Sequence, residues 1–204
     1  MPVYDAVINT LGSISTGGLM VHPEGIAVYD SLFVEIVISV FCVLASINFI
    51  LYHYVVTGKA SYLLKDIELR VFIIIMVLAT LVCTLGLVLQ SDASFGEALR
   101  ESFFQVVSMA TTSGYTRSPY IIWPAVCQFT LLTLMFIGGC AASTSGSIKV
   151  IRVIVMFKLI WRGCIKRMHP RSVVAVKVGG NAISAPVVSQ ITVFILLYMM
   201  IFLM

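Results

Sequence analysis

Charge is scarce in this sequence of 204 residues: only 11% are Asp, Glu, Lys or Arg, and nine are acidic. Hydrophobic residues make up 60% of the chain, and the mean hydropathy is +1.06. A water-soluble core does not need so apolar a composition, which is typical of a membrane protein. The composition therefore excludes an ordinary soluble domain and favours a chain that lies in a bilayer.

The sequence also lacks the signatures of enzymes and metal sites. Its five cysteines form no Cys-x-x-Cys pair, and its three histidines have no ligand spacing between them. The segment Gly146-Ser-Ile-Lys149 lacks the Gly-Lys-Ser/Thr core of a phosphate-binding loop. No nucleophile–base pair is recognisable. We therefore expect no catalytic residue, no cofactor and no nucleic acid partner, and we expect the cysteines to be packing residues.

Apolar runs of two lengths alternate along the chain. A helix needs about 20 apolar residues to cross ~30 Å of hydrocarbon. The sequence predicts full spans at 32–56 and 71–89, a third span that starts near 121, breaks, and resumes at 150–161, and a last apolar run over 187–204. Residues 5–14 and 99–111 are too short or too polar to cross, so they predict half-length helices.

A short turn with hydroxyl side chains and glycine follows each half-length helix. Such a turn can aim backbone carbonyls at one axis, because glycine permits unusual backbone angles, and these carbonyls can replace the water around an ion. The negative C-terminal end of the preceding helix would favour a cation there. Two such turns predict ion-conducting pore loops, with plain re-entrant turns as the alternative. The turns are Ser15-Thr16-Gly17-Gly18 and Thr112-Ser113-Gly114-Tyr115, related by a shift of 97 residues that places Gly17 on Gly114.

Small and hydroxyl residues interrupt the third span between residues 138 and 149. Backbone outside a helix is tolerated at membrane depth only where it is buried in protein or lines water. We therefore expect a non-helical loop that faces the pore axis, with a helix kink packed on a neighbour as the alternative. The residues assigned to this loop are Gly138, Gly139, Ser143, Thr144, Gly146 and Lys149.

The charges that are present indicate an orientation. Residues 149–177 hold eight Lys or Arg and no acid, and the positive-inside rule places them and residues 57–70 in the cytoplasm. Both turns then lie toward the outside, where the loop acids Asp92 and Glu97 either attract cations or only solvate the surface. Glu35 stands in an apolar span, so it is either a functional residue or a side chain that reaches the interface.

These segments carry a resemblance. The two turns, together with residues 136–152, resemble the Trk/Ktr superfamily of potassium uptake proteins. Residues 168–171 and 176–180 look specifically like the membrane subunits of the Trk branch. Leu19, where the family often has an aromatic residue, and Ser147, where it often has glycine, depart from the pattern.

The resemblance implies a fold and an assembly. Family members carry four span–pore helix–filter loop–span units around one pore, so we expect an all-α membrane protein built from such repeated units, with one broken span. Residues 1–56 would be the second half of one unit, residues 71–162 a complete unit, and residues 163–204 a cytoplasmic link and the first span of the next. The chain would be an internal fragment. Its partners would be the membrane, the remainder of a four-unit pore, a second copy in a homodimer, and a cytoplasmic nucleotide-binding regulatory subunit.

The function that follows is that of a membrane subunit of a potassium uptake system in the bacterial inner membrane. It would conduct K⁺ through a backbone-carbonyl filter gated by the intramembrane loop at 138–149, with K⁺ as the transported ion. One alternative is a sodium-coupled carrier with discontinuous helices, which would need inverted repeats. Another is a non-conducting truncated membrane protein. The sequence leaves open the preference between K⁺ and Na⁺ and any coupling to H⁺ or Na⁺.

Overall fold

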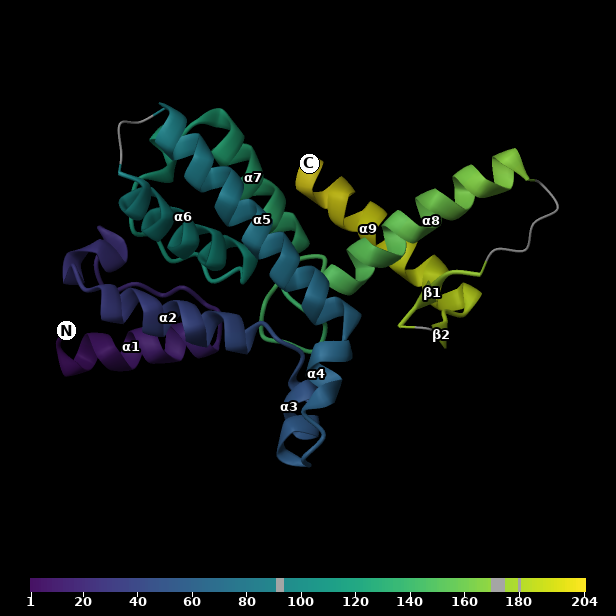
Figure 1. The fold of residues 1–204 in the computed structure, drawn as a ribbon, viewed down its shortest axis with the longest axis horizontal. Coiled ribbons are helices and arrows are strands. Elements are labelled where there is room, and N and C mark those ends of the chain that lie inside the picture. The colour runs from purple at the N-terminus through teal and green to yellow at the C-terminus, as the bar shows by residue number, and fades with distance from the viewer. Residues whose placement is uncertain (91–93, 170–174, 180) are drawn as a thin grey trace.

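Helices dominate the computed structural model, which describes residues 1–90, 94–169, 175–179 and 181–204 (Figure 1). Asp92, Arg171 and Gly180, which the sequence singled out, lie outside these residues. The helices are α1 (Val3–Ile14), α2 (Leu32–Ala45), α3 (Phe49–Val56), α4 (Ser61–Lys65), α5 (Ile67–Gln90), α6 (Phe95–Ala110), α7 (Ala125–Ile137), α8 (Val150–Met168) and α9 (Ala185–Leu203). Short 3₁₀ turns cover Gly25–Tyr29 and Tyr120–Ile122, and strands β1 (Lys177–Val178) and β2 (Asn181–Ala182) form a small antiparallel hairpin.

Both half-length helices predicted from the sequence are present, as α1 and α6. The second begins at Phe95, four residues earlier than expected. Ser94 is its N-cap: the Ser94 hydroxyl accepts a hydrogen bond from the Glu97 backbone N–H and donates one to the Glu97 carboxylate at 2.8 Å. This N-cap satisfies the Glu97 backbone N–H, which would otherwise be unpaired in the first turn.

The span predicted at 32–56 is not one continuous helix. It consists of α2 and α3, which are bent by 94° at a short break. Asn48 starts the second piece, since its Oδ1 accepts a hydrogen bond from the backbone N–H of Ile50 at 2.9 Å. The polar residues Ser46 and Asn48 therefore mark a break in the helix and not merely a polar interruption of a span.

Two helices of the described chain, α5 and α9, are long and apolar enough to cross a membrane, and the bent pair of α2 and α3 adds a third candidate. Figure 1 shows α5, α6 and α7 packed together, with α1 beside α2 and the α3–α4 hairpin projecting from the bundle. The core lies mainly among α5, α6 and α7. Its most buried members include Phe72, Cys83, Phe104, Val106, Cys127 and Leu131.

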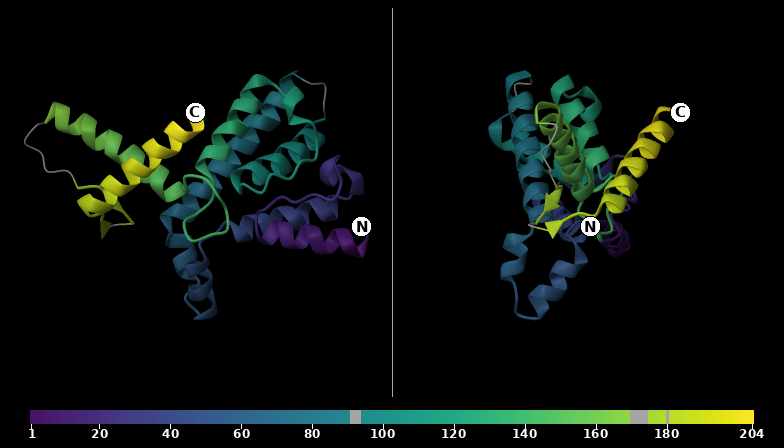
Figure 2. Two further views of the ribbon diagram at one scale, coloured as in Figure 1. Left: turned by 180° about the vertical axis from the view of Figure 1, so that it is seen from behind. Right: turned by 90° about the vertical axis from the view of Figure 1, so that its right-hand side faces the viewer.

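Helices α8 and α9 form an arm that extends away from this bundle (Figure 2). Helix α8 runs to Met168, beyond the expected end at residue 161, so part of the basic link is helical and not a loop. In the β1–β2 hairpin Val178 pairs with Asn181, and Pro186 lies in the first turn of α9. No residue of α9 is buried.

Candidate functional site

The two glycine turns have the same backbone conformation. Thr16 and Thr112 have φ values of 51° and 57°, and Gly18 and Gly114 have φ values of 59° and 81°. The true shift between the turns is therefore 96 residues, and the predicted shift of 97 was wrong. Gly17 corresponds to Ser113 and not to Gly114. The sequence comparison paired Gly17 with Gly114 because both are glycine. In the structure, the first left-handed residue of each turn is a threonine, so the threonines correspond.

Each turn ends its helix in the same way. The backbone N–H of Gly17 donates to the Gly12 carbonyl and that of Ser113 to the Ser108 carbonyl, both at 2.9 Å. The N–H groups of Thr16 and Thr112 bond three residues back, at 3.3 and 3.1 Å. This is the Schellman pattern, in which glycine usually takes the left-handed residue. A β-branched threonine there is strained, and such strain is concentrated at functional sites.

The two turns touch each other. A Cβ on Gly18 would overlap the backbone carbonyl of Ser113, so only glycine allows this approach. Around Gly114, by contrast, a Cβ would meet no described atom within 4 Å. The second turn also supports α1, because the hydroxyl of Tyr115 donates to the Asn9 carbonyl at 3.1 Å. Tyr115 itself is only 1% exposed.

Buried hydroxyl groups at the end of α6 and within the second turn stabilise that turn. The Ser108 hydroxyl donates to the Tyr115 carbonyl at 2.7 Å, and the hydroxyls of Thr111 and Ser113 lie 2.8 Å apart. Ser108, Thr111, Ser113 and Tyr115 are all buried. The carbonyl of Tyr115 is thus occupied by the protein, which leaves the exposed Gly114 as the open part of this turn.

A cluster of polar side chains fixes the loop after the first turn, residues 19–31, to α1. The carboxylate of Asp5 accepts a hydrogen bond from the Tyr29 hydroxyl at 2.8 Å and lies 3.1 Å from His22 Nε2. Burial, together with the hydrogen bond to Asp5, raises the pKa of the Tyr29 hydroxyl. Tyr29 therefore stays a neutral donor, and the loop that follows the first turn is folded back onto α1.

The expected break of the third span is confirmed: α7 ends at Ile137 and α8 begins at Val150. Between them Gly138 has a φ of 70°, and the non-glycine residues Ala142, Ser147 and Lys149 have φ values of 51°, 71° and 80°. Gly139 and Gly146 have no positive φ. Residues 138–149 therefore form a strained loop and not a kinked helix, and four positive φ values are held there by the surrounding contacts.

This loop reaches both turns. The Thr144 hydroxyl lies 3.3 Å from the Thr16 hydroxyl and donates to the Ile14 carbonyl at 3.2 Å. The backbone N–H of Gly146 donates to the Thr112 hydroxyl at 2.7 Å. The two strained threonines are thus the points at which the loop contacts the turns.

The loop also pairs with the break in the 32–56 span. The backbone N–H of Cys140 donates to the Ser46 carbonyl at 3.0 Å, and that of Phe49 donates to the Ala142 carbonyl at 3.0 Å. The N–H of Thr144 bonds the Ala45 carbonyl at 3.2 Å. Two interrupted spans therefore satisfy each other's free backbone groups, as the interior of a membrane requires.

Glu68 is a residue whose role the sequence analysis missed. It lies at the start of α5 and is 6% exposed. Its carboxylate accepts hydrogen bonds from the backbone N–H groups of Ala141 at 2.7 Å and Ile151 at 3.1 Å. The sequence placed Glu68 only within residues 57–70, a segment assigned to the cytoplasm, although a carboxylate next to a long apolar run is itself a signal. Lys149, which was assigned to the loop, folds back onto the Ser143 and Ser145 carbonyls.

Known proteins resemble the whole chain. The family model TrkH, described as "Cation transport protein", matches residues 1–204. The Trk system potassium uptake protein TrkH of Salmonella typhimurium is 33% identical over 205 residues, which cover 99% of this chain and 42% of that protein. TrkG of Escherichia coli, another Trk system potassium uptake protein, is 32% identical and aligns with 97% of this chain and 41% of its own length.

The structural match agrees with these relatives. The crystal structure of the potassium transporter TrkH from Vibrio parahaemolyticus has a TM-score of 0.93 and 35% identity, and the match covers all of this chain and 44% of that one. The chain thus spans less than half the length of these relatives. The expected helical membrane fold is confirmed at this level, as is the expectation of a transport protein rather than an enzyme. The chain belongs to the TrkH family of cation transport proteins.

Proposed function

We propose that this chain is the middle portion of the membrane subunit of a potassium uptake system in the bacterial inner membrane. Residues 15–18 and 112–115 would supply two of the four segments of one ion filter. The observation that carries this proposal is the direct contact between two turns of identical backbone conformation, each at the C-terminal end of a half-length helix. Relatives over the full chain are named potassium uptake proteins.

The chemistry of the turns suits a monovalent cation. Backbone carbonyls and hydroxyls line them, and no carboxylate belongs to either turn. A site of neutral oxygens can replace the hydration shell of K⁺ and still release the ion. The C-terminal ends of α1 and α6 add negative potential at the same place. K⁺ would therefore be the transported ion, without a resident cofactor.

Residues 138–149 would gate this filter from the cytoplasmic side. One loop contacts Thr16 and Thr112 together, which requires both turns to lie at the same depth. Because the loop is tied to the two turns by a few hydrogen bonds, a small shift of α8, which lies largely outside the core, could move it.

The filter assignment is tested with Gly114→Ala in the full-length protein. The φ of 81° is unfavourable for alanine by about 1–2 kcal/mol, and the new methyl group would enter the space left for the ion. K⁺ uptake should fall, or Na⁺ should be admitted, at an unchanged membrane level. Gly96→Ala is the matched control, because Gly96 is a helical residue of α6 with open space around it. Unchanged uptake and ion preference in Gly114→Ala would contradict the filter.

The gate is tested by deleting residues 143–146 in the same protein. Removal of the loop's contacts to both turns should raise the K⁺ flux. A deletion of Gly58 and Lys59 in the α3–α4 hairpin controls for the loss of residues, since Gly58 has no described neighbour within 4 Å of a Cβ. An equal or lower flux through a well-expressed loop deletion would contradict gating.

The basic segment of α8 would face a cytoplasmic regulatory subunit. Arg162 is half-buried, whereas Lys166 and Arg167 at the end of the helix are exposed. Reversing these three charges to Glu should weaken a complex with the nucleotide-binding subunit in a salt-dependent way. An unaffected pull-down, with correct insertion, would identify the segment as an anchor for anionic lipid.

The remaining partners follow from the length of the relatives. The two further filter segments would come from the rest of a four-unit pore, which would also cover α9. A homodimer is part of the same proposal. Cross-linking of the full-length protein in membranes tests it, and a monomer at all cross-linker concentrations would contradict it.

A further inference from the structure

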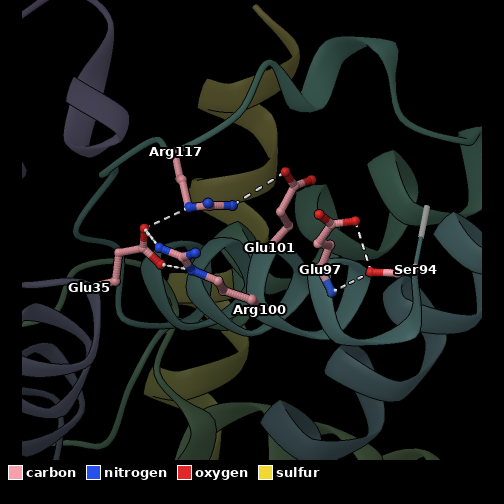
Figure 3. A network of polar contacts seen from close by, with 6 residues as sticks. All are labelled: Glu35, Ser94, Glu97, Arg100, Glu101 and Arg117. Atoms are coloured by element: carbon pink, nitrogen blue, oxygen red, sulfur yellow. Dashed lines mark hydrogen bonds and ion pairs between the residues drawn. The ribbon is translucent and has the colours of Figure 1, made fainter. Parts of the chain in front are cut away.

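Glu35 carries a buried carboxylate near the outer end of α2, and two arginines surround it (Figure 3). Its side chain is only 4% exposed. Arg100 donates to it through Nε and Nη2, both at 2.8 Å, and Arg117 donates through Nε at 2.7 Å. The side chain does not extend to a water interface, so the alternative interpretation of Glu35 made from the sequence was wrong.

The three residues come from different parts of the pore. Glu35 lies on the helix that follows the first turn, and Arg100 lies on the half-length helix that precedes the second. Arg117 belongs to the extended segment just after the second turn, two residues beyond Tyr115. A single carboxylate therefore connects two repeat units with both sides of the second turn.

The segment after the second turn has further contacts that fix its path. The backbone N–H of Ile26 donates to the Thr116 carbonyl at 2.9 Å. Arg117 also reaches Glu101 through Nη1 at 3.3 Å, so its planar guanidinium bridges two carboxylates. Lysine could supply the charge but not this fork geometry. The direction in which the chain leaves Gly114 and Tyr115 thus depends on where Arg117 is held.

Removing the charge of Glu35 would leave two guanidinium groups close together without their shared partner. A buried charge that loses its partner is strongly unfavourable, so the arginines would move toward water. Arg117 would take the adjoining backbone with it. Unbalanced positive charge near the outer mouth would also oppose the approach of cations.

We infer that Glu35 is a positioning residue for the second filter segment and that its ion pairs with Arg100 and Arg117 determine ion preference. The inference rests on the proposed filter. Glu35 would touch no ion. It would act through Arg117 on the carbonyl positions of residues 112–115, and therefore on how well K⁺ is distinguished from Na⁺.

The experiment compares Glu35→Gln with Glu97→Gln in the full-length protein, by competition of Na⁺ with K⁺ uptake. Glu97 is the matched control, because it lies on α6 near the same network, contacts Ser94, and keeps its capping role as glutamine. The preference for K⁺ should fall on the order of tenfold in Glu35→Gln, equivalent to about 1.4 kcal/mol, and stay within about twofold in Glu97→Gln. A merely structural role would lower the amount of protein without changing the ion preference of what remains.

Arg117→Lys tests the same inference if the Glu35→Gln protein does not fold. It keeps the charge but cannot bridge Glu35 and Glu101, so the preference for K⁺ should fall by a smaller factor. Unchanged preference in whichever of the two variants is produced overturns the inference. Gly114→Ala in the same assay separates the two proposals. If it alters ion preference and Glu35→Gln does not, the filter stands and the role of Glu35 fails. If neither variant alters ion preference and Gly114→Ala also leaves K⁺ uptake unchanged, the filter fails as well.

Discussion

The two turns differ in their surroundings although their backbones agree. Tyr115 follows the second turn and is 1% exposed, whereas Leu19, at the equivalent place 96 residues earlier, is 69% exposed. Tyr115 reaches α1 through its hydrogen bond to Asn9, and the helix before the second turn, α6, packs on α5, α7 and α2. The comparison teaches that hydrogen bonds at the helix end determine the conformation of each turn, and that neighbouring units determine its burial.

Gly18→Ala should have the largest effect, because it breaks the contact between the turns. Alanine would overlap the Ser113 carbonyl and would also need a φ of 59°. Both turns would have to move, so we expect K⁺ uptake by the full-length protein to fall by well over about tenfold, given a strain of ~1–2 kcal/mol from φ alone. Near-normal uptake would show that the turns do not touch in the working protein.

Tyr115→Leu should come next, because it removes the support that the second turn gives to α1. The loss of a buried aromatic ring and of the hydrogen bond to Asn9 should cost about 2–4 kcal/mol of stability. Tyr115→Phe removes only the hydroxyl and its hydrogen bond, which should lower the stability by about 1 kcal/mol. Leu19→Ala is the control and should stay within ~0.5 kcal/mol. Thermal unfolding in detergent measures the stability of all three variants. Equal effects at Leu19 and Tyr115 would contradict the difference in burial between the two turns.

Thr112→Val against Thr16→Val compares how firmly the loop holds each turn. Valine keeps the shape of threonine, so both variants lose only hydrogen bonds. Thr112 alone accepts the Gly146 N–H, and its loss, worth about 1 kcal/mol, should raise the flux several-fold if the loop closes the pore. The Thr144 hydroxyl can still donate to the Ile14 and Ala45 carbonyls when Thr16 is replaced. Thr16→Val should therefore change the flux less. K⁺ flux is measured in membrane vesicles. A larger effect of Thr16→Val than of Thr112→Val would show that the loop is held mainly by the first turn.

Gly17→Ala should have the smallest effect. Gly17 has no positive φ, and a Cβ there would meet only the flexible Ser15 hydroxyl at 3.0 Å. We expect uptake within about twofold of the parent, since Ser113, the residue that corresponds to Gly17 in the second turn, already carries a side chain there. A defect as large as that of Gly18→Ala would restore the 97-residue alignment and contradict the equivalence of Gly17 with Ser113.

The sequence determined the features that depend on local composition and on the bilayer. Apolar runs of full and half length indicated the helices, and small residues at 138–149 indicated a loop, because membrane interiors penalise any backbone that is neither helical nor protected. The resemblance to potassium uptake proteins depended on the same segments. The roles of the turn and loop residues stay predictions until the experiments above are done.

Only the tertiary structure decided which distant groups meet. The bend near Asn48 depends on carbonyls that the loop at 138–149 satisfies, and those partners are about 95 residues away in sequence. The correspondence between the residues of the two turns was recognised from positive φ angles at Thr16 and Thr112. A threonine adopts such angles only where the surrounding packing enforces them. Glu35 and Glu68 appeared in the sequence as isolated acids. Their roles come from arginines and backbone N–H groups that the fold brings to them, and periodicity cannot specify such long-range pairings.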